Sequence, residues 1–138
     1  MKIAIRYFTK SKKGNTKKLA GAVSAALGIE ALDVSADISE KTDRLFLINA
    51  MYAANIDPEV VRFLERNKDK IGEIVNMNTS ASGKSPWSMV KKETDALGIR
   101  LSAQEFHCAG SWIFINQGRP TAEDLAAAGA FTKSMCEA

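Results

Sequence analysis

The sequence alternates between short apolar runs and segments with helical spacing along its whole length. Residues 44–50, RLFLINA, form a near-continuous apolar run, which is typical of a strand buried on both faces of a sheet. Strands that alternate with helices predict a parallel sheet with helices on both faces, joined by right-handed crossovers. The predicted strands are residues 2–8, 29–34, 44–50, 71–78 and 99–107.

Capping residues mark where the predicted helices begin and end. Asn15 or Thr16 is predicted to cap the first helix, which ends at Gly28. Asp57 is the predicted N-cap of the second helix, since Pro58 suits the first helical position, where no N–H is needed. The remaining signals are the cap-then-proline pair Ser85-Pro86, the stop at Gly98 and a capping box, Thr121-x-x-Asp124.

Length and composition indicate an ordinary globular protein. A chain of 138 residues with 46% hydrophobic and 25% charged residues predicts a single domain, residues 1–138. We expect a cytoplasmic protein, because no apolar run is long enough to cross a bilayer and the N-terminus lacks the pattern of a signal peptide. Cys108 and Cys136 lack metal-ligand spacing, and His107 is the only histidine, so we expect reduced thiols and no metal site.

Positive charge gathers near the start of the chain. The formal net charge is +3, from 19 basic and 16 acidic residues. Without the five lysines near the first loop the balance is 14 against 16, so the excess is local and suits an anion. A solvated loop is the alternative interpretation. No second basic stripe is present, which argues against a nucleic-acid surface. The five residues are Lys10, Lys12, Lys13, Lys17 and Lys18.

Ligands of open α/β sheets bind outside the carboxyl ends of the strands, where the strand order reverses. The loops that matter are therefore residues 9–16, 50–57 and 79–84. The first loop, TKSKKGNT, offers hydroxyl donors, a glycine and a helix N-terminus, which together suit a phosphate. A simple turn with a helix cap is the alternative for this loop.

The second and third loops suit a flat ring. Tyr52 follows a buried strand and lies beside small residues, so it can stack on a ring or pack on its own helix. The third loop, TSASGK, is made of small residues that leave room for a planar ligand. Gly83-Lys84-Ser85 also resembles part of a nucleoside-triphosphate loop, but the first glycine of that motif is absent.

With these loops in place, the chain resembles the flavodoxin family, specifically its short single-domain members. The resemblance is carried by KIAIRYFTKSKKGNTKKLA, RLFLINAMYAANIDPEVVRFLE and FHCAGSWIFINQGRPTAEDLAAAGAF, and covers nearly the whole chain. It implies an α/β fold: a flavodoxin-like three-layer sandwich with a five-stranded parallel sheet in the order 2-1-3-4-5. It also implies FMN as the cofactor, bound non-covalently.

The resemblance assigns a role to each of the three loops and implies no catalytic and no metal-binding residue of the chain's own. The phosphate would be held by Thr9, Ser11, Gly14, Asn15 and Thr16, with charge from Lys12 and Lys13. One side of the flavin ring would lie along Met51, Tyr52, Ala53 and Ala54. Its other edge would lie along Thr79, Ser80, Ala81, Ser82 and Gly83.

The function that this resemblance implies is electron transfer, with an unidentified redox partner protein, by a monomer or weak dimer that binds neither nucleic acid nor membrane. Two departures from the family keep alternatives open. Lys12 and Lys13 lengthen the phosphate loop by two residues, and the sequence pI is near 8.9 although electron-carrying flavodoxins are acidic. The alternatives are a flavin-free module that binds another anion or a protein, and an enzyme that reduces a small substrate with FMN and a nicotinamide.

Overall fold

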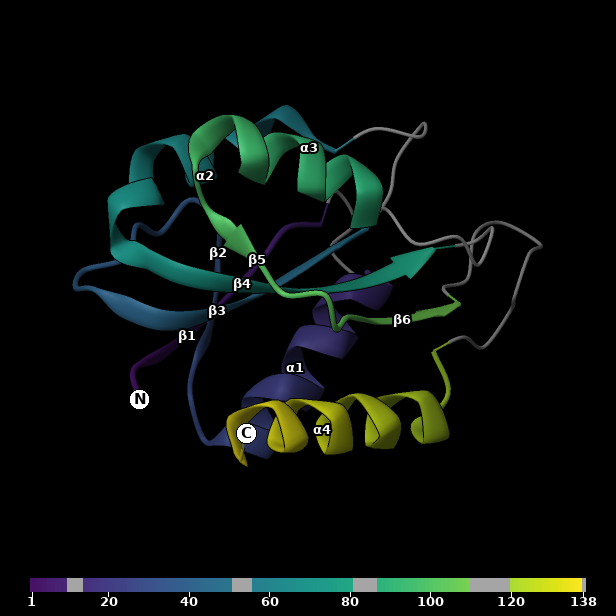
Figure 1. Ribbon diagram of the computed structural model, residues 1–138. Helices are drawn as coiled ribbons and strands as arrows, with labels where there is room; N and C mark the ends of the chain where they lie inside the picture. Colours follow the sequence, from purple (N-terminus) through teal and green to yellow (C-terminus); the bar gives the residue numbers. More distant parts are fainter. Residues whose placement is uncertain (10–13, 51–55, 81–86, 110–119, 138) are drawn as a thin grey trace.

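The computed structural model describes residues 1–9, 14–50, 56–80, 87–109 and 120–137. Within these ranges the chain forms a parallel sheet between two layers of helices (Figure 1). In chain order the elements are β1 (Ile3–Tyr7), α1 (Asn15–Leu27), β2 (Ala31–Asp33), β3 (Thr42–Ala50), α2 (Pro58–Asn67), the 3-10 turn η1 (Lys68–Lys70), β4 (Ile71–Ser80), α3 (Trp87–Leu97), β5 (Arg100–Leu101), β6 (Phe106–Ala109) and α4 (Ala122–Glu137).

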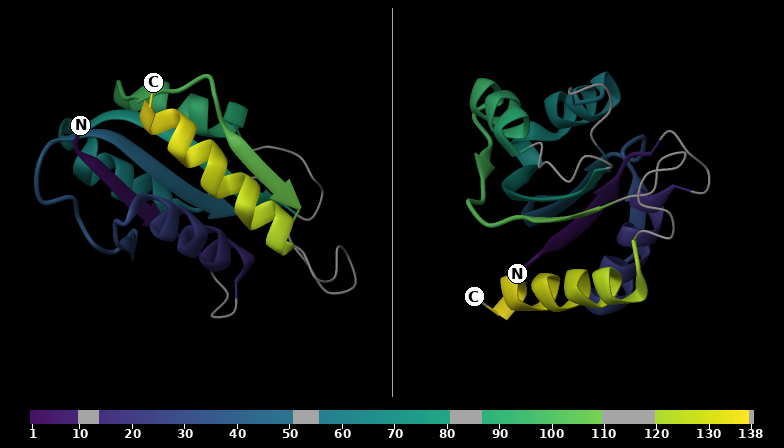
Figure 2. Two further views of the ribbon diagram at one scale, coloured as in Figure 1. Left: turned by 90° about the horizontal axis from the view of Figure 1, so that it is seen from below. Right: turned by 90° about the vertical axis from the view of Figure 1, so that its right-hand side faces the viewer.

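The sheet has the order β2-β1-β3-β4-β5, and β6 also pairs with β4. Every strand pair is parallel. Helices α1 and α4 lie side by side on one face, while α2 and α3 cover the other (Figures 1 and 2). The predicted α/β sandwich and its strand order, 2-1-3-4-5, are therefore confirmed.

The fifth position of the sheet differs from the prediction of one strand over residues 99–107. The structure forms β5 and β6 there, and both pair with β4: Arg100 lies opposite Glu73, and Phe106 opposite Met77. The chain leaves the ladder after Ser102, whose hydroxyl accepts a bond from the Gln104 N–H at 3.2 Å. This local bond turns the backbone out of the strand, and the alternation of apolar residues carries no sign of it.

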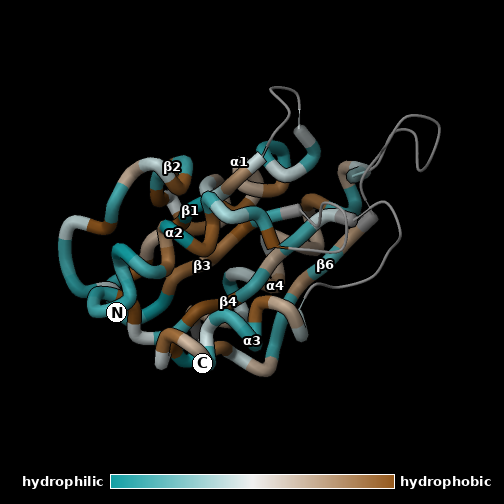
Figure 3. Tube along the Cα trace, turned by 90° about the horizontal axis from the view of Figure 1, so that it is seen from above, coloured by the Kyte–Doolittle hydropathy of each residue, from teal (hydrophilic) through white to brown (hydrophobic). Residues whose placement is uncertain are grey.

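Side chains from alternate strand positions fill two separate cores. Strand residues that point toward α1 and α4 pack with those helices, and strand residues that point the other way pack with α2 (Figure 3, where the apolar part of β3 is brown). The first core is built from Ile5, Phe46, Ile48, Val75 and Met77 with Leu19, Val23, Ala128 and Met135. The second is built from Leu45, Leu47 and Ile74 with Val60, Phe63 and Leu64.

Most of the predicted helix ends are confirmed. Gly28 and Gly98 end α1 and α3 with φ values of 67° and 72°, a conformation that glycine adopts without strain. The Asp57 carboxylate accepts a bond from the Glu59 N–H at 2.9 Å and so caps α2. None of the helices that the structure describes is long and apolar enough to cross a membrane. The predicted cap at Ser85-Pro86 lies outside the described residues.

The capping box before α4 is also confirmed. The Thr121 N–H donates to Asp124 Oδ2 at 2.8 Å, and the Asp124 N–H donates to Thr121 Oγ1 at 3.1 Å. Aspartate thus closes the box as glutamate does in its usual form. The predicted cap of α1 by Asn15 or Thr16 is wrong, because the N-cap residue is Gly14 and Thr16 Oγ1 bonds instead to a strand.

Candidate functional site

The candidate site lies where β1, β3 and β4 end, because parallel strands finish at the same edge of a sheet. The strand order reverses between β1 and β3, and α1 and α2, which follow these two strands, lie on opposite faces. The structure describes part of the predicted site: Thr9, Gly14, Asn15, Thr16, Thr79 and the backbone of Ser80. The predicted residues Ser11, Lys12, Lys13, Met51, Tyr52, Ala53, Ala54, Ala81, Ser82 and Gly83 lie outside the described residues.

The N-terminus of α1 has no side-chain cap among the described residues. Gly14 is buried in an extended conformation, with φ −59° and ψ 144°, and its carbonyl accepts bonds from the N–H groups of Lys17 and Lys18 at 3.1 and 3.3 Å. The first turn contains no acidic residue, whereas the first turn of α2 has both the Asp57 cap and Glu59. The positive end of the α1 dipole is therefore left without a negative partner from its own turn.

Thr16 joins this helix end to the sheet. Its Oγ1 lies 3.2 Å from Thr79 Oγ1 at the carboxyl end of β4, and the two residues are 2% and 3% exposed. Two hydroxyl groups that share one hydrogen bond use one of their two O–H hydrogens, so one O–H remains to be donated. The pair fixes the first turn of α1 against β4 and keeps a donor at the point where the two meet.

The opposite face of the same strand ends carries three buried asparagines that were not predicted. Asn49 continues the Leu45 and Leu47 series on β3, and Asn76 and Asn78 continue the Ile74 series on β4, so all three side chains lie on the α2 and α3 face. Their exposed fractions are 2%, 0% and 0%. A sequence signal exists: LINA and VNMN place amides at alternate positions of otherwise apolar strands.

Only part of this asparagine cluster is hydrogen-bonded. Asn49 Nδ2 donates to Asn76 Oδ1 at 3.0 Å, and Asn76 Nδ2 donates to Glu105 Oε2 at 3.4 Å. Within the described residues, Asn49 Oδ1 and both amide atoms of Asn78 have no hydrogen-bond partner. A buried polar atom without a partner costs about 1–3 kcal/mol, so these atoms lower the stability of the ligand-free chain.

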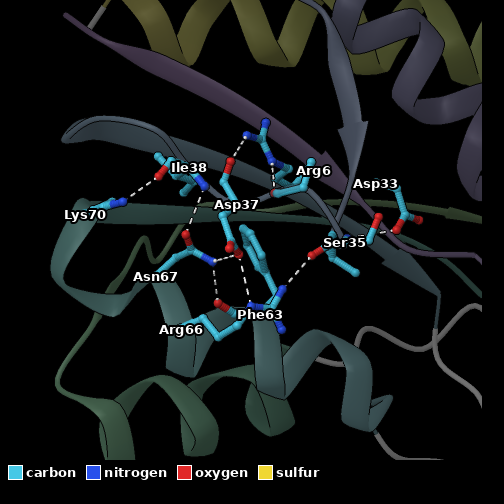
Figure 4. A network of polar contacts seen from close by, with 11 residues as sticks. Arg6, Asp33, Ser35, Asp37, Ile38, Phe63, Arg66, Asn67 and Lys70 are labelled. Carbon is cyan, nitrogen blue, oxygen red and sulfur yellow. Dashed lines mark hydrogen bonds and ion pairs between the residues drawn. The ribbon is translucent and has the colours of Figure 1, made fainter.

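A second polar network, away from the strand ends, has its partners in place. Asn67 at the end of α2 is 2% exposed, accepts a bond from the Ile38 N–H and donates to Phe63 O and Asp37 Oδ1 (Figure 4). Arg6 donates to the carbonyls of Ala36 and Asp37, also in this network. These bonds hold the segment after β2 against β1 and α2, which is a structural role.

Hydrogen bonds and burial also shift the pKa values of two side chains in this network. Bonds from Arg66 and Asn67 lower the pKa of the Asp37 carboxyl below its ordinary value. Burial lowers the pKa of the Arg6 guanidinium, and the nearby Asp37 charge opposes that shift. The network belongs to the fold, because none of the predicted site residues takes part in the bonds described here.

The remaining reactive side chains that the structure describes form no further candidate site. His107 is 42% exposed, with Nδ1 3.9 Å from Glu105 Oε1, and neither Cys108 nor Cys136 is joined in a disulfide. Among the residues that the structure describes, no three His, Cys, Asp or Glu side chains are placed to hold a metal ion.

Comparison with known proteins gives structural likeness at low sequence identity. The chain is similar to a flavodoxin from the domain Archaea, with a TM-score of 0.74 and 13% identity over 99% of this chain and 97% of that chain. The chain is also similar to a short-chain flavodoxin associated with a non-canonical PDU bacterial microcompartment, with a TM-score of 0.68 and 14% identity over 99% of this chain and 98% of that chain. A third similar structure is a flavoprotein in complex with FMN from Lactobacillus acidophilus NCFM, with a TM-score of 0.63 and 15% identity over 77% of this chain and 92% of that chain.

These solved structures show that the chain has the flavodoxin-like fold over nearly its full length. The sequence itself matches no family model. It also matches none of the curated proteins.

Proposed function

We propose that this chain binds FMN non-covalently at the carboxyl ends of β1, β3 and β4 and transfers electrons to or from a partner protein. The observation that carries the proposal is the α1 N-terminus, whose first turn contains no acidic residue and is fixed to β4 by the Thr16–Thr79 bond. The likeness to flavodoxins, and to a flavoprotein whose structure contains FMN, supports this assignment.

The described residues fit the phosphate end of FMN. The first turn of α1 presents backbone N–H groups and a positive dipole end, which is a general anion site in proteins. Lys17 and Lys18 lie exposed on that turn and add positive charge, and the Thr16–Thr79 pair keeps one hydroxyl donor. Together these groups complement a phosphate dianion without an acidic side chain in the turn to repel it.

FMN, when bound, supplies the chemistry, because its ring accepts and returns electrons. The protein itself would bind the phosphate at α1, hold the ring beside the ends of β3 and β4, and shield the ring from water. We assign the ring contacts to residues 51–54 and 79–83 on the family resemblance.

A flavin-free module that binds another phosphate remains the second candidate, because a helix N-terminus with lysines and no acidic residue in its first turn suits other compact anions as well. Binding of FMN and riboflavin separates the two functions. We expect FMN to bind apo-protein at least tenfold more tightly than riboflavin, since only FMN carries the phosphate. Binding of inorganic phosphate without either flavin would favour the second candidate.

Thr16→Val tests the site within this experiment. It removes the hydroxyl that ties α1 to β4, so we expect FMN affinity to fall about tenfold and riboflavin affinity to stay unchanged. Thr132→Val is the matched control, because Thr132 is also fully buried on the α1 and α4 face but donates to Ala128 O within its own helix. Equal losses in the two variants would remove Thr16 from the phosphate site.

A further inference from the structure

The asparagine cluster, Asn49, Asn76 and Asn78, replaces apolar packing with amides at the ends of β3 and β4. Asn49 and Asn78 lie directly opposite each other in the strand register and point to the same face. Farther from the strand ends, the same face is filled by Leu45, Leu47 and Ile74. The change from leucine and isoleucine to asparagine therefore occurs at the edge where the fold binds its ligands.

The chemistry of the unpartnered atoms defines what they can bind. Asn78 offers an amide N–H₂ donor beside a carbonyl acceptor, and Asn49 Oδ1 adds a second acceptor. All of these groups are neutral, so they complement an uncharged group and not a phosphate. A carboxamide pairs in a bidentate way with a ring edge that has an acceptor next to a donor, as asparagine does with adenine.

Asn78 lies on the face of β4 opposite to the face where Thr79 contacts the proposed phosphate site at α1. Asn78 and Thr79 are consecutive in β4 and point to opposite faces, so Thr79 contacts α1 while Asn78 lies under α2 and α3. One strand end thus offers a hydroxyl donor on the anion side and a neutral amide on the other. A ligand with a phosphate at one end and an uncharged heterocycle at the other matches this division.

We propose that Asn78, with Asn49 beside it, hydrogen-bonds the imide edge of the flavin ring, where a carbonyl oxygen stands next to the ring N3–H. The inference rests on the proposed function, because it assumes that the ligand is a flavin. It assigns the asparagine pair to recognition of the ring and leaves recognition of the phosphate to α1. Asn78 is then a specificity-determining residue for an unsubstituted N3–H.

The test combines Asn78→Ala with a ligand that lacks the same hydrogen bond. Riboflavin and 3-methylriboflavin differ at N3, where a methyl group replaces the hydrogen. We expect the wild-type apo-protein to bind riboflavin about tenfold more tightly than 3-methylriboflavin, and Asn78→Ala to bind the two equally. Asn67→Ala is the matched control, because it removes a buried asparagine that already has its partners, and it keeps the wild-type preference.

Each outcome decides between specific claims. A wild type without preference for riboflavin, or an Asn78→Ala protein with the same preference as wild type, would overturn the inference and leave FMN binding standing. Failure of the wild type to bind any flavin would overturn both the inference and the proposed function. Should Asn78→Ala fail to fold, Asn78→Val removes the amide while refilling its volume, and the same loss of preference is expected.

Discussion

Two buried asparagines on the same side of the sheet, Asn67 and Asn78, differ in their hydrogen bonds. Asn67 accepts one bond and donates two, whereas neither amide atom of Asn78 has a partner within the described residues. Both are at most 2% exposed, so burial does not distinguish them. The comparison indicates that Asn67 stabilises the fold, while Asn78 costs stability that a ligand can return.

Replacing each asparagine by alanine gives the largest expected difference. Asn67→Ala leaves the buried Ile38 N–H without its acceptor, so we expect the free energy of unfolding to fall by about 2–3 kcal/mol. Asn78→Ala removes two unpartnered atoms and leaves a small cavity, so we expect a change within about 1 kcal/mol. Urea unfolding of the apo-proteins measures both, and equal losses would show that Asn78 is structural.

The helix N-termini extend the same comparison, because α2 has an acidic cap, whereas the structure describes no acidic residue in the first turn of α1. Asn15→Asp places a negative charge in the first turn of α1 with almost no change in shape. We expect FMN affinity to fall about tenfold at low salt and riboflavin affinity to stay constant, because the new charge repels only the phosphate. Raising the salt concentration should shrink the loss; a loss that is the same for both flavins would contradict a phosphate at α1.

The converse change removes the cap that α2 already has. Asp57→Ala deletes the carboxylate that accepts the Glu59 N–H, so we expect a loss of about 1 kcal/mol in unfolding free energy. FMN affinity should not change. Chemical denaturation and a flavin titration of the same variant measure the two quantities. A loss of FMN affinity that the lower stability does not account for would place Asp57 in the binding site.

The smallest expected effect concerns the stability of the protein at acidic pH. Because hydrogen bonds lower the pKa of Asp37 in the folded chain, its contribution to stability is complete above the ordinary value of 3.8 and is lost as the pH falls through the lowered value. We therefore expect the denaturation midpoint of wild type to fall more steeply than that of Asp37→Asn as the pH is lowered below about 4. Parallel pH profiles for the two proteins would mean that this carboxylate contributes nothing.

The fold was largely predictable because most of its strands and helix ends have a local signal. Apolar runs gave the strands, and Asp57-Pro58, Gly28 and the Thr121–Asp124 box gave helix ends that the structure confirms. The split of the fifth strand was not predictable, since it depends on hydrogen bonds made by Ser102 and not on hydrophobic spacing. One of these comes from far along the chain, where Trp87 Nε1 donates to Ser102 O at 3.0 Å.

The candidate site was predictable in its location and less so in its residues. The loop positions follow from the alternation of strands and helices, but the α1 cap was misassigned because Thr16 bonds to Thr79, 63 residues away. The asparagine cluster was missed because a hydrophobic pattern is read as core even when amides interrupt it. An amide at an inward position of a buried strand is a visible signal, although its partners depend on the tertiary structure.

The most direct measurement is a nitrogen-15 correlation spectrum of the apo-protein in which the side-chain amide signals of Asn67 and Asn78 are followed while FMN is added. We predict that the Asn78 signal shifts as FMN binds, that riboflavin at saturation produces the same shift, and that the Asn67 signal stays in place. Saturated FMN binding without a shift at Asn78 would contradict the claim that its unpartnered amide belongs to the ligand site.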